Sequence, residues 1–422
     1  MNKVVIGLDV GTNKVVALIG IVKQDGQVDI VGVGSCRSLG LRRGAVINIE
    51  ATTQSIKTAI HEAELMAGVG VTEVYTGVSG NHIRSCNSRG IVAIKDREVT
   101  QSDLERVMDT AQALTIPADH QVIHIIPQEF ILDGQGGVRE PIGMAGVRLE
   151  VSAHIVTGSI SAIQNIVKSI ERCNIKVKDV ILQPLASSVA VLSDDERELG
   201  CVLVDIGGGT TDIAIFTGGT IQYSSVIPIA GDQATNDVSI AFRMPARSAE
   251  QLKLNYANLN PENEQDETIE INLGEHNSQS GRKVSSRRLT EVLTARYQEL
   301  FALVNNEIRR SGLLTHLNAG VILTGGGSKI AGVVPLAEEI FDLPVRVGVP
   351  QNIGGLVEVV SNPVYATGVG LLLVAAQRMQ QQTQGQRQEL AGDLGSEFDE
   401  MSGEDEDVSL WRKIKNWIKN NF

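Results

Sequence analysis

Short apolar runs, most of them bounded by glycine, proline or charged residues, dominate the first half of the chain. Runs of about four to eight residues that are rich in Val, Ile and Leu predict buried β-strands. We expect strands at 3–10, 14–22, 27–34, 121–126, 129–133, 178–182 and near 147–156.

Helical periodicity separates these strands at two places. Over 51–67 the apolar residues Ile56, Ile60 and Met66 lie near one face of a helix. A second helix is expected over 159–173, directly before the next strand. Strands that alternate with helices in this way predict an α/β fold.

Residues 80–153 interrupt the pattern and are predicted to be an insertion. A helix begins there at Thr100, which is spaced from Asp103 as in a capping box, and ends before Pro117. Short strands and a glycine-rich loop make up the rest of the predicted insertion.

The alternation of strands and helices returns from Gly200 onward. Residues 245–313 are more polar, with an alternating strand that contains Ile269, Ile271 and Leu273. The other expected elements are strands at 201–206, 211–217, 220–227 and 320–324, an amphipathic helix at about 290–311 and a last globular helix at about 364–377.

Two similar glycine-rich turns each follow a buried strand. The longer one runs from Asp205 through three glycines and two threonines to Asp212, and the shorter one runs from Asp9 to Lys14. The two leading aspartates are 205 − 9 = 196 residues apart. This spacing, the size of a domain, indicates two similar domains that face one phosphorylated ligand.

The residue types in these turns suit phosphate and Mg²⁺. Glycines let backbone N–H groups approach phosphate oxygens, and a lysine adds a point charge. Aspartates can hold a hydrated Mg²⁺ that bridges phosphate oxygens. A plain hairpin turn between two strands is the alternative for either motif alone, and the pair together favours the ligand site. The residues concerned are Asp9, Gly11, Thr12, Lys14, Asp205, Gly207, Gly208, Gly209, Thr210 and Asp212.

Composition narrows the class of protein. The 422 residues are 42% apolar and include 43 glycines, which fits two globular domains and a tail. The net charge of −13 does not favour nucleic-acid binding. Neither the four cysteines nor the seven histidines have metal-ligand spacing. We expect no secretory signal and no membrane-spanning helix.

The last 44 residues differ from the rest. Residues 379–407 hold six glutamines and nine acidic residues, which predicts a disordered linker with a reach of about 30 Å. Residues 408–422 predict a short helix with an apolar face about 140° wide, and its remaining surface is basic. That pattern is typical of an interfacial membrane helix, too short to span a bilayer. The apolar face has Leu410, Trp411, Ile414, Trp417 and Ile418, and the basic residues are Arg412, Lys413, Lys415 and Lys419.

One such tail is expected to bind a membrane weakly. Four basic residues contribute about 1 kcal/mol each near anionic lipid, but a short helix is costly to fold. Many tails on one polymer would bind firmly, so membrane residence is expected to depend on self-assembly. Docking of this helix on a partner protein or on the chain's own core is the alternative.

Three motifs together resemble the phosphate and adenosine motifs of the actin, Hsp70 and hexokinase superfamily: Asp9 to Thr12, Asp205 to Asp212, and Leu323 to Gly327. Within it, the chain resembles the FtsA family of bacterial cell-division proteins over essentially its whole length. The specific stretches are 79–83, 124–130, 143–148 and 185–188.

The resemblance implies an ATP and Mg²⁺ site in a cleft between two domains. The turn residues given above would meet the phosphates, and the three aspartates would orient Mg²⁺ through water. Glu250 and Lys253 resemble a pair that holds the ribose and base, although an ordinary exposed helix is the alternative. Gly231 would lie beside the nucleotide, and Gly325, Gly326 and Gly327 would pass under the adenosine.

The resemblance also implies an actin-like duplicated two-domain ATPase fold with an inserted subdomain, the disordered linker and the amphipathic helix. Its subdomains would be 1A (1–79, 154–185 and 350–378), 1C (80–153), 2A (186–231 and 314–349) and 2B (232–313).

Partners follow from the same resemblance. Subdomain 1C would contact the neighbouring protomer and later division proteins, and subdomain 2B would bind the C-terminal peptide of the tubulin-like protein FtsZ. Arg282, Arg287 and Arg296 are the basic candidates for that peptide, with a solvated basic patch as the alternative. The implied role is a polymer on the cytoplasmic face of the inner membrane, at the septum, that tethers the FtsZ ring.

Catalysis is the weakest part of this expectation. Gln183 occupies the position of a water-positioning residue, but an amide is no strong base, so slow ATP hydrolysis at most is expected. The same residue is equally a strand end packed against a helix. A sugar kinase and an Hsp70-type chaperone fit the tail poorly, and a pilus-assembly ATP-binding protein of the same superfamily is the remaining alternative.

Overall fold

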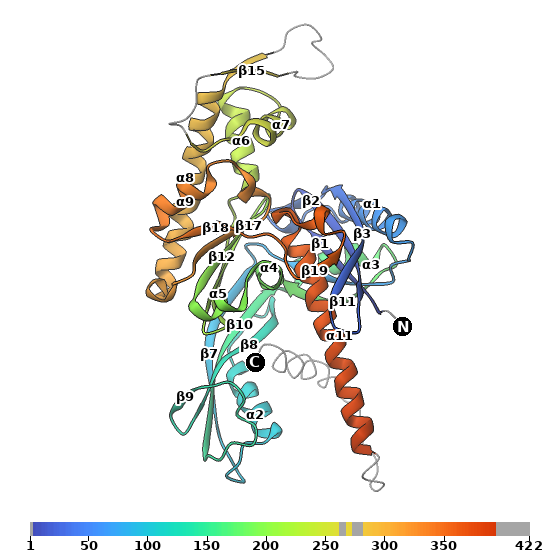
Figure 1. Cartoon of the computed structure of the whole chain (residues 1–422), viewed down its shortest axis with the longest axis vertical. Coiled ribbons are helices and arrows are strands. Elements are labelled where there is room, and N and C mark those ends of the chain that lie inside the picture. Colours follow the sequence, from blue (N-terminus) through green and yellow to red (C-terminus); the bar gives the residue numbers. More distant parts are fainter. Residues whose placement is uncertain (1–2, 261–266, 272–281, 394–422) are drawn as a thin grey trace.

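The structure is a computed structural model that describes residues 3–260, 267–271 and 282–393. Two α/β halves lie side by side, and a smaller sheet extends below them (Figure 1). The sheet of each half contains an antiparallel hairpin whose first strand also pairs with a parallel neighbour. The predicted duplication is therefore present in the strand topology.

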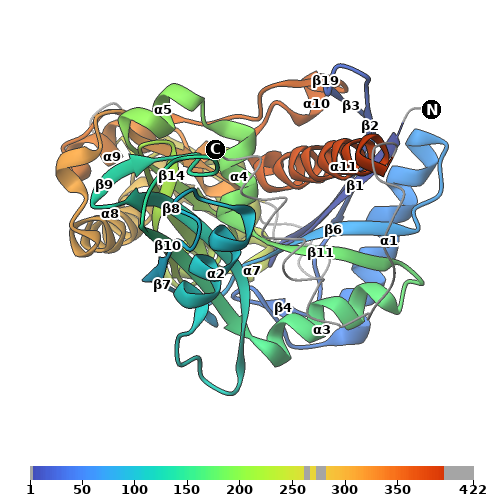
Figure 2. The ribbon, with the colours of Figure 1, turned by 90° about the horizontal axis from the view of Figure 1, so that it is seen from below.

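The first half is built on a six-stranded sheet. Its strands, in spatial order, are β11 (Lys176–Leu182), β6 (Glu73–Val78), β1 (Lys3–Val10), β2 (Lys14–Val22), β3 (Val28–Arg37) and β19 (Ile353–Gly355). Helices α1 (Ile49–Ala67) and α3 (Ile160–Glu171) cover one face, and α4 (Gln183–Val191) and α11 (Ala366–Asp393) lie on the other (Figure 2). A short ribbon, β4 (Leu41–Arg42) with β5 (Ala45–Val46), precedes α1.

Helix α1 shows how local sequence sets the element. Asn48 caps its start by accepting from the N–H of Ala51 at 3.1 Å, and Gly68 ends it with a φ of 68°. Ile56 and Ile60 are buried as predicted, but Met66 is exposed. The buried stripe includes Ala59 instead, because small residues at helical spacing let α1 approach the sheet closely.

The second half is built on a five-stranded sheet. Its strands, in spatial order, are β14 (Thr220–Ile227), β13 (Thr211–Thr217), β12 (Cys201–Ile206), β17 (Gly320–Thr324) and β18 (Val345–Val347). Alternate residues of β12 face opposite cores: Val202 and Val204 pack with the helices of this half, and Cys201 and Leu203 pack in the cluster that contains α4 and α11. Those helices are α6 (Gly231–Ala241), α7 (Ala246–Tyr256), α8 (Ser286–Ser311) and α9 (Val333–Phe341).

Small elements complete the halves. They are α5 (Asp194–Leu199), the pair β15 (Thr268–Ile271) and β16 (Arg282–Ser285), α10 (Val357–Val360), and the 3-10 turns η2 (Leu314–His316), η3 (Gly326–Lys329) and η4 (Pro363–Tyr365).

The predicted insertion is a separate four-stranded sheet with one helix on it. Helix α2 (Gln101–Gln112) has the predicted capping box between Thr100 and Asp103. Its strands, in spatial order, are β7 (Ile83–Ala93), β10 (Arg148–Ser159), β8 (His120–Leu132) and β9 (Gln135–Val138).

Side chains of the insertion dock on the main chain of β14, the edge strand of the second half. Ser85 donates to the carbonyl of Ser224 at 2.7 Å, and Asn87 donates to the carbonyl of Gln222 at 3.1 Å. Gln128 donates to the carbonyl of Ile221 at 3.1 Å. We call this contact the polar seam; it joins an insertion carried by the first half to the second half.

His154 lies buried inside the polar seam. Its Nδ1 is 2.7 Å from Asn87 Oδ1, and its Nε2 is 2.9 Å from Ser224 Oγ. Because the Asn87 amide nitrogen already donates to β14, its oxygen must accept, which assigns the imidazole proton to Nδ1. Burial lowers the pKa of His154 to about 4, so the ring is neutral at physiological pH.

Two sequence expectations are corrected here. The strands predicted at 121–126 and 129–133 are one strand, β8, because Pro127 lies beside a bulge that tolerates its missing N–H. The long helix predicted from about 290 begins at Ser286, where Ser285 caps it. Leu273 lies outside the described residues.

The start of the predicted linker is also corrected. Helix α11 continues through residue 379 to Asp393, so the first half of 379–407 is helical and not disordered. Gln, Glu, Arg and Ala in this stretch are good helix formers, and they extend a helix that the core has already nucleated. Residues 394–422 lie outside the described residues.

Candidate functional site

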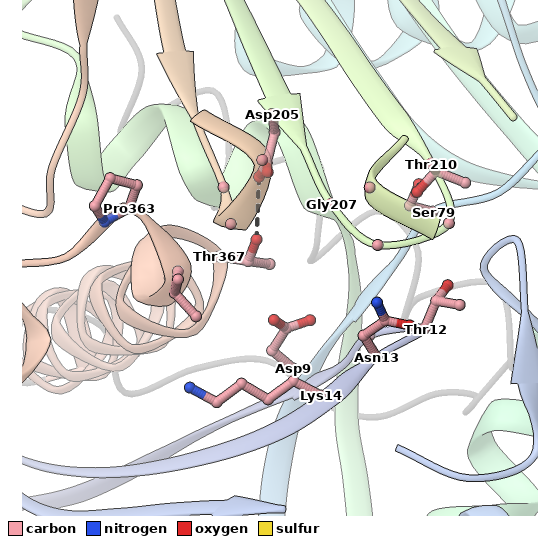
Figure 3. A pocket seen from close by; sticks show the side chains of 18 of the residues that line it. Asp9, Thr12, Asn13, Lys14, Ser79, Asp205, Gly207, Thr210, Pro363 and Thr367 are labelled. Carbon is pink, nitrogen blue, oxygen red and sulfur yellow. Dashed lines mark hydrogen bonds between the residues drawn. The ribbon is translucent and has the colours of Figure 1, made fainter. Parts of the chain in front are cut away.

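The two glycine-rich turns face each other across a cavity of about 360 Å³ (Figure 3). Each turn closes with the same hydrogen bond: Gly11 N–H donates to the Lys14 carbonyl, and Gly207 N–H donates to the Thr210 carbonyl, both at 3.0 Å. The shared geometry confirms that the two motifs are structural repeats. All ten predicted turn residues line the cavity.

The turns approach so closely that side chains are excluded from them. A Cβ on Gly208 would lie 2.6 Å from Asn13 Cγ, and a Cβ on Gly209 would lie 2.6 Å from Thr12 Oγ1. A side chain at position 208 would therefore displace Asn13, and glycine is required at position 209, where the backbone of Arg43 also lies 3.0 Å from the added Cβ.

Three carboxylates stand at the base of the turns. Asp205 and Asp212 are register partners across β12 and β13, and Asp9 is the second-last residue of β1 in the other half. Asp205 accepts from Ser187 at 2.7 Å. It also accepts from Thr367 at 3.3 Å (Figure 3).

The other two carboxylates also accept hydrogen bonds from side chains. Asp212 accepts from Ser79 at 2.5 Å and from Thr210 at 3.3 Å. Asp9 accepts from the Gln183 amide at 3.1 Å. Ser79 therefore joins the first half to Asp212 of the second half.

The carboxylates destabilise one another's charges. Burial and repulsion from Asp205 raise the pKa of Asp9 to about 7, although Lys14 partly offsets this. Burial raises the pKa of Asp212 to about 7 against the effect of the Ser79 hydrogen bond. Burial also raises the pKa of Asp205. A cation in the cavity would stabilise the ionised forms, so the carboxylates suit a divalent metal ion.

The described residues contain no group of three His, Cys, Asp or Glu side chains arranged to hold a metal ion. Mg²⁺ keeps several waters in most protein sites. The residue types at this site are compatible with a hydrated Mg²⁺.

The far wall of the cavity comes from α7 and from the loop after β17. Lys253 is buried, donates to the Gly231 carbonyl at 3.1 Å and to Thr235 at 2.7 Å, and forms an ion pair with Glu250 at 2.7 Å. The alternative that Lys253 lies on the exposed face of an ordinary helix is therefore wrong. Glu250, the ion-pair partner of Lys253, is half-buried and lines the cavity.

The glycines after β17 are held by close contacts. Gly325 has a φ of 80°, and a Cβ there would lie 2.3 Å from Asp205 Oδ1. A Cβ on Gly327 would lie 2.3 Å from Ile206 Cγ2, and its carbonyl accepts from Tyr297 at 2.9 Å. With Gly326, these residues form one edge of the cavity.

Several residues at the site carry no role in the sequence analysis. Asn13 donates to Asp232 at 2.6 Å, which joins the two halves directly. Ser79 and Ser187 lie in stretches that suggested the family, but nothing in their spacing indicated contacts with Asp212 and Asp205. Thr367 stands in the first turn of α11, and no sequence signal linked it to a carboxylate 162 residues away.

The three predicted peptide-binding arginines differ in their surroundings. Arg296 is partly buried, forms an ion pair with Asp237 at 2.5 Å and contacts Glu299. Arg287 is exposed beside Glu291 at 3.5 Å. Arg282 begins β16, and its side chain lies outside the described residues.

The predicted membrane helix also lies outside the described residues. In the described part, no helix combines the length and the apolar character that crossing a membrane requires.

Comparison with protein families gives two matches that do not overlap. Residues 80–157 match the SHS2 domain inserted in FtsA, and residues 202–370 match the cell division protein FtsA. The first range covers the insertion, and the second includes the Asp205 turn and the start of α11.

Curated relatives match along almost the whole chain. Cell division protein FtsA of Pseudomonas aeruginosa is 50% identical, and the match covers 100% of this chain and 99% of that protein. The protein of the same name in Neisseria meningitidis is 47% identical over 98% of both chains, and that of Escherichia coli K12 is 43% identical over 88% and 90%.

Solved structures share the fold at low identity. A PilM–PilN type IV pilus biogenesis complex gives a TM-score of 0.63 at 16% identity, over 88% of this chain and 98% of that one. MreB5 of Spiroplasma citri bound to ADP gives 0.52 at 17% identity, over 87% and 94%. The actin-like fold and the sequence matches agree, and the chain belongs to the FtsA family of cell-division proteins.

Proposed function

We propose that this chain binds ATP with Mg²⁺ in the cavity between its halves. The observation that carries the proposal is the pair of identically hydrogen-bonded glycine turns that face one cavity. Their backbones and the hydroxyls of Thr12 and Thr210 would hold the phosphates from two sides. Glu250 and Lys253 would hold the ribose and base, with Gly231 and Gly325 to Gly327 close to the adenosine. MreB5 structures with ADP and with AMPPNP have this fold, which supports the proposal.

Asp9, Asp205 and Asp212 would hold Mg²⁺ through water. The ion would supply positive charge to the phosphates and to three carboxylates whose pKa values are raised mainly by burial. Gln183 contacts Asp9 in the cavity, where its amide would orient a water molecule. An amide cannot remove a proton, so we propose slow hydrolysis at most and a mainly regulatory role for the nucleotide.

A cell-division protein of this family is expected at the septum. We propose that this one polymerises on the cytoplasmic face of the inner membrane, tethers the FtsZ ring there and recruits later division proteins. The subdomain boundaries given above belong to the same proposal. Residues 408–422 would contact anionic lipid, and residues 232–313 would bind the FtsZ peptide. Arg287 is exposed, and its ion pair with Glu291 is long at 3.5 Å, so it suits that peptide better than the partly buried Arg296, which pairs with Asp237 at 2.5 Å.

ATP binding is tested by equilibrium titration of the full-length protein with a fluorescent ATP analogue, with and without Mg²⁺. Gly208→Ala pushes a Cβ into Asn13 and is expected to weaken binding at least about tenfold. Gly70→Ala is the matched control, because a Cβ there meets nothing within 4 Å. Absence of binding to the wild type, or equal binding by Gly208→Ala, would contradict the proposal.

The tether is tested by sedimentation with anionic liposomes in the presence of ATP. Deletion of residues 408–422 should abolish pelleting, and persistence of pelleting would exclude the tail as the anchor.

Binding of the FtsZ C-terminal peptide is tested by fluorescence anisotropy. Arg287→Glu should weaken binding, whereas Arg309→Glu, exposed at the other end of α8, should not. If both substitutions weaken peptide binding equally, the effect is general charge attraction, and Arg287 is no specific contact.

A further inference from the structure

The ammonium of Lys14 lies over an aromatic ring, and it acts on the Asp9 carboxylate only through space, without an ion pair. Lys14 Nζ lies 4.1 Å from the ring centroid of Tyr365. In the described part of the chain, this ammonium makes no ion pair within 4 Å and no side-chain hydrogen bond. Its side chain points towards the α11 side of the cavity, away from Thr12 and Asn13 (Figure 3). A cation that lines a cavity without an acceptor is ready to receive an anionic ligand.

Tyr365 is fixed by the chain around it. It ends the 3-10 turn η4, directly before α11, and the Asn362 side chain caps that turn by accepting from Val364 N–H at 3.2 Å. The ring is half-buried against the core cluster under α11. Two residues later, Thr367 donates to Asp205. The start of α11 therefore contacts Lys14 of the first half and Asp205 of the second half.

The Tyr365 ring contacts the Lys14 ammonium on the side away from the cavity. Lys14 lines the cavity, whereas Tyr365 does not. A cation–π contact is attractive and mostly electrostatic, and it leaves the ammonium hydrogens that point away from the ring free. The donors of Lys14 thus remain directed to the cavity while its long side chain is held in place.

We propose that Tyr365 is a positioning residue for the phosphates: its ring holds the Lys14 ammonium at the cavity wall before the nucleotide binds. This inference rests on the ATP site proposed above and names a residue that no motif in the sequence indicated. Without the ring, Lys14 would lose its rotamer freedom only when the nucleotide binds. Immobilising a side chain of that length weakens affinity by roughly three- to tenfold.

The test is a double-mutant cycle on the affinity of the full-length protein for ATP and Mg²⁺. Tyr365→Leu is expected to weaken ATP binding by three- to tenfold. Tyr365→Phe, which keeps the ring, is expected to bind ATP as the wild type does. In the Lys14→Ala background, Tyr365→Leu should cause no further loss. An equal loss in both backgrounds, or no loss in either, would overturn the inference.

A second series keeps the shape of the side chain constant. Phenylalanine at position 365 with one, two and three fluorine atoms weakens the attraction of the ring for a cation stepwise, so affinity should fall stepwise. This series remains informative if Tyr365→Leu fails to fold. A flat series in a protein that binds ATP rejects only the role of Tyr365, whereas absence of ATP binding in the wild type rejects the proposed function.

Discussion

Replacing Asp212 by asparagine should stabilise the nucleotide-free protein and weaken its nucleotide site. Asp212 is buried, and its pKa is raised from 3.8 to about 7. In Asp212→Asn, the amide oxygen still accepts from Ser79, and the amide nitrogen can donate to Thr210. The substitution therefore removes a disfavoured charge while it keeps the hydrogen bonds.

The sign and size of the effect follow from the pKa. Below about pH 4 the carboxyl is neutral in both the folded and the unfolded protein, so it costs nothing. Between about pH 4 and 7 only the unfolded form ionises, so the stability of the wild type falls as pH rises. About three pKa units at 1.36 kcal/mol each set a ceiling of about 4 kcal/mol above pH 7. We expect the asparagine variant to gain about 2–4 kcal/mol there.

The assay is urea unfolding from pH 4 to pH 8 without nucleotide or Mg²⁺, compared between wild type and variant. Asp96→Asn, at an exposed turn of the insertion, is the matched control and should change little. ATP with Mg²⁺ should then stabilise the wild type more than Asp212→Asn. A stability difference that is the same at pH 4 and pH 8, or a variant that is less stable at pH 8, would refute the reasoning.

Three further predictions concern neighbouring features. Ser79→Ala removes a hydrogen bond that lowers the pKa of Asp212, so the pH-dependent loss of stability should extend to higher pH in the same urea assay. Gly325→Ala combines a φ of 80° with a Cβ 2.3 Å from Asp205 and should cost at least about 2 kcal/mol in unfolding free energy, whereas Gly326→Ala, with no neighbour nearer than 3.9 Å, should cost much less. His154 stays neutral in the folded protein, so the unfolding free energy should fall as pH drops from about 6.5 to 4. His154→Gln should reduce this fall. If the pH dependence of the unfolding free energy is unchanged in the variant, another group titrates in this range.

The sequence predicts best where apolar runs end at strong turn residues. The three strands that surround the Asp205 turn have the predicted bounds, because three glycines fix the first of their connections and two fix the second. Strand β7 was missed because Arg84, Asn87 and other polar residues interrupt any apolar run. Its polar residues are explained by the polar seam, which local sequence does not reveal.

The candidate site divides in the same way. Its glycines and aspartates are adjacent in sequence, and short-range patterns are sufficient to find them. Ser79, Thr367 and Tyr365 reach the site from other elements, and only the packing of the two sheets around α4 and α11 brings them there. Long-range contacts of single polar residues leave no periodic signal in a sequence.

The polar seam also bears on aggregation. Strand β14 is an edge strand, and an uncovered edge offers main-chain carbonyls to the strand of another molecule. Here Ser85, Asn87 and Gln128 occupy three of those carbonyls. The insertion therefore shields the second half from intermolecular strand pairing. Removing residues 80–157 would uncover β14 as an aggregation-prone edge strand. A soluble shortened protein would then need a charged or proline residue in β14.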